Sequence, residues 1–244
     1  MPRYFIEVSY KGTNYSGFQV QQNANSVQAE IEKAMVIFYK QKFELTGSSR
    51  TDTGVHAFQN FFHFDTEITI MDDAYNLNAI LPDDIVVKRI FKVDDNAHCR
   101  FDALSREYRY YIYQNKNPFL QDRAYYVPYS MDIELLQQAA EEIMKHTDFT
   151  SFSKRNTQVK SFMCNIYASE WVQEADCVVY KIKANRFLRG MVKGLVATML
   201  LVGKKKISLD EFRSIIETKD CTKADFSVPP DGLFLVKLTF PFLA

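Results

Sequence analysis

The chain has 244 residues, of which 47% are hydrophobic and 25% are charged, and this composition excludes an intrinsically disordered protein. Because 30 basic residues balance 30 acidic ones, a polyanionic partner would have to be bound by local basic patches. The four cysteines are widely spaced and form no C-x-x-C pair. This spacing argues against a zinc site or a disulfide framework and favours a reducing compartment, the cytoplasm.

Neither a targeting segment nor a membrane span is expected. The chain starts with Met1-Pro2-Arg3 and passes directly into an alternating segment, so we expect no signal peptide. The longest apolar run, Leu195 to Val202, is much too short to cross a bilayer. We therefore expect no association with a membrane.

The first half of the chain predicts strands and helices in alternation. Residues 4–10 alternate in polarity, as a half-buried strand does, and a polar loop follows at 11–24. Apolar residues at helical spacing predict a helix over 27–40, with Ser26 as its N-cap. The remaining expected elements are a strand at 43–45, a strand at 59–65, a helix at 72–81 that ends before Pro82, and a strand at 85–93.

A polar connection at 96–105 predicts a boundary between two domains, residues 1–103 and residues 104–244. Each half begins with a tyrosine-rich strand and continues with a helix and further strands. The pattern favours an α+β fold of two related domains, each a mainly antiparallel sheet with helices on one face. In the second half we expect a strand at 107–114, a helix at 133–145, a strand region at 171–184 with an acidic turn at 174–176, helices at 187–202 and 209–217, and a strand at 233–240.

The densest polar cluster lies at residues 46–57, between two strand-like segments, and brings Arg50, Asp52 and His56 together within seven residues. The nearby guanidinium favours an ionised Asp52, which is the form that acts as a nucleophile or a base. Such a cluster is typical of a functional site. The alternative interpretation is a turn or N-cap aspartate, and His56 is either a ligand contact or a structural hydrogen bonder.

A second cluster lies in the helix expected at 187–202. Arg186, Arg189 and Lys193 are spaced by three and four residues and would form one basic stripe. Gly190 and Gly194 would form a stripe of small residues beside it, at a cost of roughly 1 kcal/mol each relative to alanine. We infer that close packing near a site offsets this cost. The alternative is a solvated basic face.

A third cluster, at residues 106–111, interleaves arginine with tyrosine. This combination suits RNA, because aromatic rings stack on unpaired bases and guanidinium groups hold phosphates, although tyrosine is also an ordinary strand residue. In the last strand, Leu233 falls on the face expected to be more polar, where it either lines a cleft or packs at an edge. Other basic residues are surface charges or phosphate contacts: Arg100, Arg155, Lys160 and Lys204 to Lys206.

The whole chain resembles the TruA family of tRNA pseudouridine synthases. The strongest match is the segment from Arg50 to Ala57, which is similar to the catalytic loop of that family. Other matching segments follow in the family's order: 17–19, 81–85, 106–110, 148–152, 184–193 and 232–233. Such collinearity is far more specific than one short motif.

The resemblance implies a role for several residues. Asp52 corresponds to the catalytic aspartate, Tyr108 to the tyrosine that stacks on the target base, and Lys193 to the basic partner of the aspartate. Leu233 corresponds to the apolar residue beneath the base, and Arg50 to an arginine that holds the flipped nucleotide. Lysine at position 193 departs from the usual arginine and lacks its bidentate fork.

Three further residues are expected to bind substrate, namely His56, Arg186 and Arg189. The family also implies an active-site cleft between the two domains, a homodimer, tRNA as the partner, and no metal or other cofactor. The implied reaction converts uridine to pseudouridine at positions 38 to 40 of the anticodon arm.

Two other function classes remain as alternatives. One is a non-catalytic RNA-binding protein, which would not need Asp52. The other is a phosphotransfer enzyme with an aspartyl-phosphate, which is disfavoured because a second acidic cluster and a phosphate-binding loop are missing from the sequence.

Overall fold

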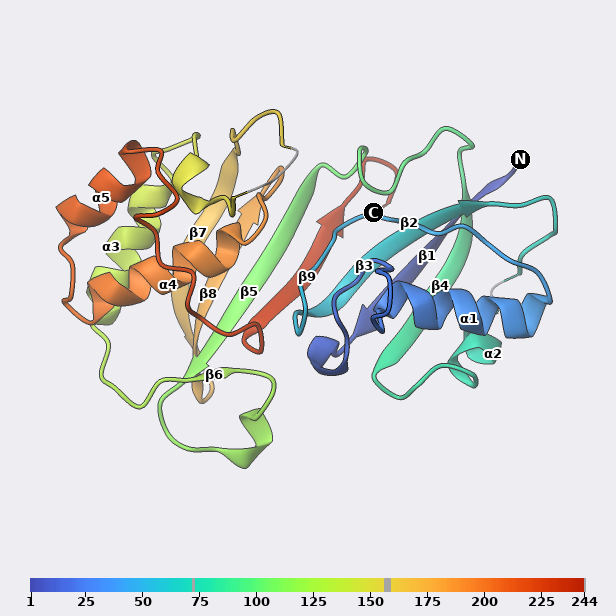
Figure 1. Cartoon of the computed structure of the whole chain (residues 1–244), viewed down its shortest axis with the longest axis horizontal. Coiled ribbons are helices and arrows are strands. Elements are labelled where there is room, and N and C mark those ends of the chain that lie inside the picture. The colour runs from blue at the N-terminus through green and yellow to red at the C-terminus, as the bar shows by residue number, and fades with distance from the viewer. Residues whose placement is uncertain (72, 156–158, 244) are drawn as a thin grey trace. The chain divides into compact units, whose positions relative to one another are not determined.

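The computed structural model describes residues 1–71, 73–155 and 159–243, and the chain divides into two compact units (Figure 1). The first unit comprises Met1–Leu104 and Phe234–Ala244, and the second comprises Ser105–Leu233. The division falls one residue from the predicted boundary. The predicted second domain, however, contained the C-terminal segment that the structure groups with the first unit.

The first unit is built on a mixed sheet in the order β4-β1-β3-β9, with β2 paired to β3. Its pairs are antiparallel except for β3 and β9, which run parallel with His56 opposite Phe234. The strands are β1 (Arg3–Tyr10), β2 (Thr46–Gly47), β3 (His56–Asp65), β4 (Ile85–Val93) and β9 (Leu233–Thr239). The last strand of the chain thus pairs with a strand from the N-terminal half of the sequence.

Two helices pack beside this sheet, and Figure 1 shows them next to each other. Helix α1 (Val27–Tyr39) begins where predicted, and the Ser26 side chain accepts a hydrogen bond from the backbone of Ala29, which confirms the predicted cap. Helix α2 (Ala74–Asn78) lies against β4, where the Asn78 side chain exchanges two hydrogen bonds with the backbone of Val87, each 2.8 Å long.

Two predictions for the first unit were wrong in detail. Residues 43–45 form no strand, because the backbone of Leu45 bonds to side chains of α1: Gln28 donates to its carbonyl and Glu32 accepts from its amide. Helix α2 is also much shorter than the predicted helix at 72–81, although it ends before Pro82, and Asp72 lies outside the described residues.

The second unit has a sheet in the order β5-β8-β7, in which neighbouring strands are antiparallel. A short strand, β6, pairs with β5 in parallel. The predicted acidic turn is confirmed as the tight connection of the hairpin formed by β7 and β8. Helix α3 contacts β7, α4 and α5, and nearly every residue of α4 is buried. The elements are β5 (Ser105–Tyr113), β6 (Tyr125–Tyr126), β7 (Ile166–Glu174), β8 (Cys177–Ala184), α3 (Ile133–Ile143), α4 (Met191–Gly203) and α5 (Leu209–Glu217).

Helix α4 corrects the predicted basic stripe. It begins at Met191 and not at residue 187, because Gly190 stands at its N-cap with φ of +74°, a left-handed conformation that helices do not continue through. Arg186 and Arg189 therefore lie in the preceding loop, and only Lys193 lies on the helix.

The predicted α+β class is confirmed, with a mixed sheet in each unit. Short 3-10 turns complete the elements: η1 (Gly12–Asn14), η2 (Pro118–Leu120) and η3 (Thr150–Phe152). None of the helices within the described residues is both long enough and apolar enough to cross a membrane.

Candidate active site

The loop that carries Asp52 is fixed at both ends by the first unit's sheet. We call residues 48–55 the Asp52 loop. Before it, β2 pairs with β3 so that Thr46 lies opposite His63 and Gly47 opposite Phe62. After it, the chain enters β3 directly at His56. The polar cluster found in the sequence is therefore a connection between two paired strands, and both ends are held by backbone hydrogen bonds.

The inner side of the Asp52 loop is held by buried polar side chains. The hydroxyls of Tyr10 and Thr51 share a hydrogen bond of 2.8 Å, and Asn60 donates to both the Tyr10 hydroxyl and the Ser49 carbonyl. The Asn60 oxygen accepts from the Ser49 amide in return. These contacts bury the residues on either side of Arg50 while leaving Arg50 exposed.

The exposure pattern separates Arg50 and Asp52 from the residue that lies between them. Thr51 is buried, whereas Arg50 is exposed and Asp52 is half-buried. The chain thus alternates across these three residues, so that the guanidinium and the carboxylate project away from the core that holds Thr51. A carboxylate in such a place is able to act as a nucleophile or as a base.

The segment that follows β1 binds the backbone of the Asp52 loop from a second side. The Phe18 amide donates to the Thr51 carbonyl, and the Gly54 amide donates to the Tyr15 carbonyl. Within the loop, the Val55 amide donates to the Asp52 carbonyl and closes a tight turn, in which Gly54 has φ of +77°. The backbone on both sides of Asp52 is thereby tied down.

Gly12 makes the closest approach between these two segments. A Cβ at this position would overlap the Val55 carbonyl group, so only glycine fits. The Gly12 amide donates to Nδ1 of His56 over 2.9 Å. His56 is only 1% exposed, and its ring packs on Phe234 with centroids 4.5 Å apart. These contacts favour the structural interpretation of His56 over a contact with a ligand.

In the second unit, Tyr108 lies on β5 and is half-buried. Its ring packs edge-to-face on Phe187, with centroids 5.1 Å apart and an interplanar angle of 84°. The loop that supplies Phe187 is tied to neighbouring strands, because Arg106 donates to the Asn185 carbonyl and Asn165 exchanges hydrogen bonds with Asn185. This loop also carries the half-buried Arg186 and the exposed Arg189.

Lys193 is half-buried in the first turn of α4. The next residue, Gly194, lets an aromatic ring approach the helix, since a Cβ there would lie 2.7 Å from Cε1 of Phe226. Close packing therefore explains Gly194, as predicted, whereas Gly190 is explained by its backbone conformation. Glycine is therefore needed at the two positions for different reasons.

Leu233 is held by a second close approach of backbone. The Tyr111 amide donates to the Gly232 carbonyl over 2.8 Å, and a Cβ on Gly232 would lie 2.6 Å from the Tyr111 carbonyl oxygen. Leu233 is 6% exposed and Leu235 is fully buried. The expectation that this face of the strand is more polar was therefore wrong at its first positions.

The predicted site residues divide between the two units, and each group is fixed within its own unit. The first unit holds Arg50, Asp52 and His56, and the second holds Tyr108, Arg186, Arg189, Lys193 and Leu233. Sequence reasoning missed the supports of the Asp52 loop, which are Gly12, Tyr10 and Asn60. The signal for Asn60 was an amide in an otherwise apolar strand core, where a buried polar group needs partners.

One group among the described residues has the ligand types of a metal site, namely His63, His98 and Cys99, with ligand atoms within 4.8 Å of one another. Hydrogen bonds already use these atoms: Nδ1 of His63 lies 3.1 Å from the Cys99 sulfur, which also contacts the Thr46 carbonyl. Burial and the Arg3 charge lower the pKa of His63 to about 4. The cluster is explained as a neutral hydrogen-bonded support of β2.

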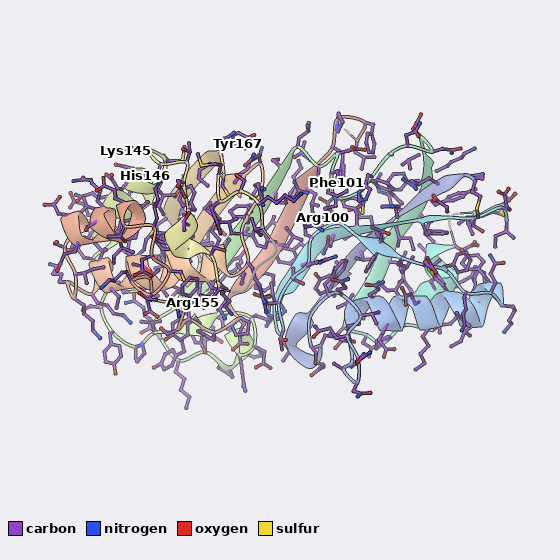
Figure 2. The ribbon with its side chains drawn as sticks, turned by 45° about the horizontal axis from the view of Figure 1, so that its top comes forward. Arg100, Phe101, Lys145, His146, Arg155 and Tyr167 are labelled. Atoms are coloured by element: carbon purple, nitrogen blue, oxygen red, sulfur yellow. The ribbon has the colours of Figure 1, made fainter. Side chains whose placement is uncertain are left out.

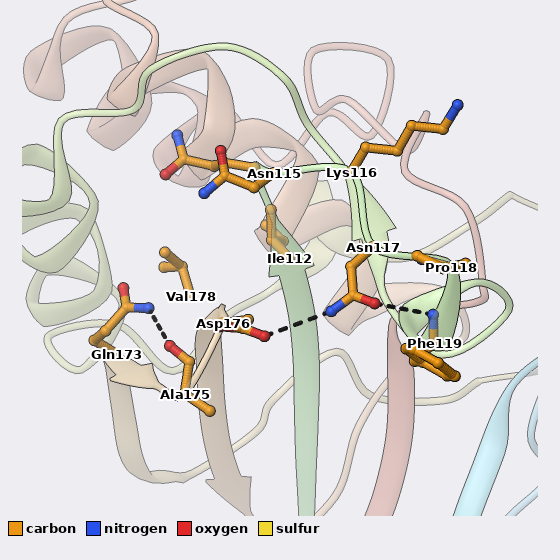
Figure 3. A pocket seen from close by; sticks show the side chains of 11 residues that line it. Ile112, Asn115, Lys116, Asn117, Pro118, Phe119, Gln173, Ala175, Asp176 and Val178 are labelled. Atoms are coloured by element: carbon orange, nitrogen blue, oxygen red, sulfur yellow. Dashed lines mark hydrogen bonds between the residues drawn. The ribbon is translucent and has the colours of Figure 1, made fainter.

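A cavity of about 530 Å³ in the second unit contains none of the predicted site residues (Figure 3). It lies beyond the C-terminal end of β5, beside the turn between β7 and β8. Asn117 anchors its rim by accepting from the Phe119 amide and donating to Asp176. The residues predicted to carry chemistry therefore lie outside this cavity, in the Asp52 loop and around β5 and α4.

Comparison with known proteins shows which family the chain is similar to. A family model described as tRNA pseudouridine synthase matches residues 6–102 and 139–241. A tRNA pseudouridine synthase A of Parabacteroides distasonis is 44% identical over 244 residues, which cover 99% of this chain and 97% of the relative. Proteins of the same name from Bacteroides thetaiotaomicron and Staphylococcus aureus are 43% and 38% identical, and the matches cover 91% and 90% of their lengths.

Substitution of Gly12 tests whether its close approach positions the Asp52 loop. In Gly12→Ala the new methyl group overlaps backbone, which cannot yield as a side chain can. We expect a loss of stability on the order of 2 kcal/mol and faster amide hydrogen exchange at residues 51–56. Gly203→Ala is the matched control, because its Cβ would meet only the Leu136 side chain, at 2.8 Å. It should leave exchange at 51–56 unchanged. Unchanged exchange in Gly12→Ala would contradict this role.

Proposed function

Since the chain belongs to the TruA family of tRNA pseudouridine synthases, we propose that it converts uridine to pseudouridine at positions 38 to 40 in the anticodon arm of tRNA. The family inferred from the sequence is thereby confirmed. The observation that carries the residue assignment is the Asp52 loop, whose backbone is bound on both sides while its arginine and its carboxylate project outward.

The reaction is an isomerisation. The bond between N1 of uracil and C1′ of ribose breaks, the base turns, and C5 bonds to the same carbon while the proton from C5 is lost and N1 gains one. Atoms and electrons balance within the substrate, so we propose that no metal or organic cofactor takes part. The target base must first leave the stack of the RNA.

Arg50 and Tyr108 are proposed to hold the flipped nucleotide. Arg50 is exposed on the outside of the Asp52 loop, where its guanidinium is placed to bind a phosphate or to occupy the space that the base leaves. The Tyr108 ring packs perpendicular to the Phe187 ring, which restricts its orientation, and we propose that it stacks on the uracil. Arg186 and Arg189 would add phosphate contacts from the loop before α4.

Asp52 is the proposed catalytic group, and two routes are consistent with its position. In one, the carboxylate attacks C1′ and displaces the uracil; in the other, it removes a proton from the ribose. Lys193 would balance the charge of the carboxylate. Leu233 is the proposed apolar surface beneath the base, and it would limit the access of water to the cleaved intermediate.

This mechanism requires residues from both units to meet at one cleft, and that arrangement is part of the proposal. We further propose that the two units are related domains, that the protein acts as a homodimer, and that it works in the cytoplasm. Family membership supports each of these points, and sedimentation analysis of the purified chain tests the dimer.

Replacement of Asp52 by asparagine tests the catalytic assignment. The change keeps the shape of the side chain and removes its charge and nucleophilicity. We expect Asp52→Asn to lose at least ~10³-fold in pseudouridine formation on a tRNA transcript and to retain tRNA binding within about threefold. Asp83→Asn, at an exposed aspartate of the same unit, should remain fully active. Substantial turnover by Asp52→Asn would sink the assignment, and a wild-type chain that binds tRNA without forming pseudouridine would indicate the non-catalytic alternative.

Lys193 is tested by comparing two substitutions. Lys193→Arg keeps the positive charge, whereas Lys193→Met keeps most of the length and removes it. We expect single-turnover rates on tRNA to fall by ~10²-fold or more in Lys193→Met and by less than tenfold in Lys193→Arg. Equal rates for the wild type and both variants would remove Lys193 from the mechanism.

A further inference from the structure

The turn formed by residues 97–102 is hydrogen-bonded to β2 and to the first residue of the Asp52 loop. The Ser48 hydroxyl donates to the Cys99 carbonyl over 2.5 Å, and the Cys99 thiol donates to the Thr46 carbonyl over 3.1 Å. Cys99 itself is fully buried. The exposed side chains of this turn therefore keep a fixed position relative to the residues just before Arg50.

His98 gives the turn its shape. Its Nδ1 accepts hydrogen bonds from the amides of Arg100 and Phe101, and its own amide donates to Asp102 over 2.7 Å. Burial and the nearby Arg3 charge lower the pKa of His98, which keeps the ring neutral and its Nδ1 lone pair available at neutral pH. The Nδ1 atom of His98 is thus the hydrogen-bond acceptor that fixes the backbone of the turn.

This turn presents an aromatic ring to solvent. Phe101 is 74% exposed, although its ring packs on the His98 ring at a tilt of 41°, with centroids 4.2 Å apart. The Arg100 guanidinium carbon lies over this ring, 5.8 Å from its centre, and Figure 2 labels the two side chains next to each other. A single exposed phenylalanine is common, but one supported from within and flanked by arginine is a ready stacking surface.

Phe101 and Arg100 line a pocket of about 200 Å³ that also contains Arg50. Leu45 and Phe18 form part of its wall, and Gly47 cannot carry a side chain there because a Cβ would lie 2.6 Å from the Phe18 ring. The pocket is smaller than the ~300 Å³ of typical sites for drug-sized ligands. Its size suits a single planar group, and its two arginines suit an anion.

We propose that this pocket, the Arg100 pocket, binds one nucleotide of tRNA adjacent to the target uridine, with its base unpaired in the complex. The base stacks on Phe101, and Arg100 and Arg50 bind the phosphate that joins this nucleotide to the target uridine. Single-stranded RNA combines a π-face with a phosphate at this spacing, whereas a paired base offers no free face for stacking. Phe101 and Arg100 are thereby assigned to substrate recognition, outside the catalytic group. The inference rests on the proposed function.

Binding measurements on an anticodon stem-loop RNA test the Arg100 pocket. We expect Phe101→Ala to raise the dissociation constant roughly 5- to 100-fold, and Arg100→Gln to reduce the slope of log K against log salt by about 1. Tyr75→Ala is the matched control, because Tyr75 is 85% exposed on α2 in the same unit. It should bind like the wild type.

RNAs with one abasic nucleotide identify the occupant. At one position next to the target, removal of the base should weaken binding by the wild type and abolish the difference between the wild type and Phe101→Ala. Binding by both pocket variants that equals that of Tyr75→Ala overturns the pocket while leaving the enzyme assignment intact. A wild-type chain that forms no pseudouridine in tRNA overturns the proposed function itself.

Discussion

The first unit depends on one steric constraint: the segment after β1 and the Asp52 loop approach so closely at Gly12 that no side chain fits between them. The contact lets the Gly12 amide bond to the buried His56, which lies where the loop enters β3. Because Thr51 is bound from the opposite side by Tyr10, the loop has support on two sides. Because the residues around Asp52 are hydrogen-bonded to the interior of the unit, the Asp52 side chain projects away from it.

The residues at the junction of β2 and the Asp52 loop have a second role. The Thr46 carbonyl accepts and the Ser48 hydroxyl donates the hydrogen bonds that hold the turn around Cys99, so β2 and the first residue of the Asp52 loop position the Arg100 pocket. A reaction that withdraws a base from RNA needs the neighbouring nucleotides held while the target moves. Anchoring recognition and chemistry to one strand would keep their separation constant.

Local signals predicted much of the fold. Strand β4 has the predicted bounds, and α5 begins at a capping box between Ser208 and Glu211. Periodicity failed at α4, where the apolar spacing continues through Gly190 although its backbone is left-handed. Asp52 was found from its neighbours in the sequence, whereas Gly12 was not, because its constraint comes from a backbone that lies far along the chain. Contacts between distant segments leave no periodic signal.

The most direct test of the whole account is to map pseudouridine at nucleotide resolution in unmodified tRNA transcripts incubated with the purified chain alone, without added metal or cofactor. We expect new pseudouridine at positions 38 to 40 in transcripts that have uridine there, and none in transcripts in which those uridines are replaced by cytidine. Transcripts that remain unmodified despite bound protein would contradict it.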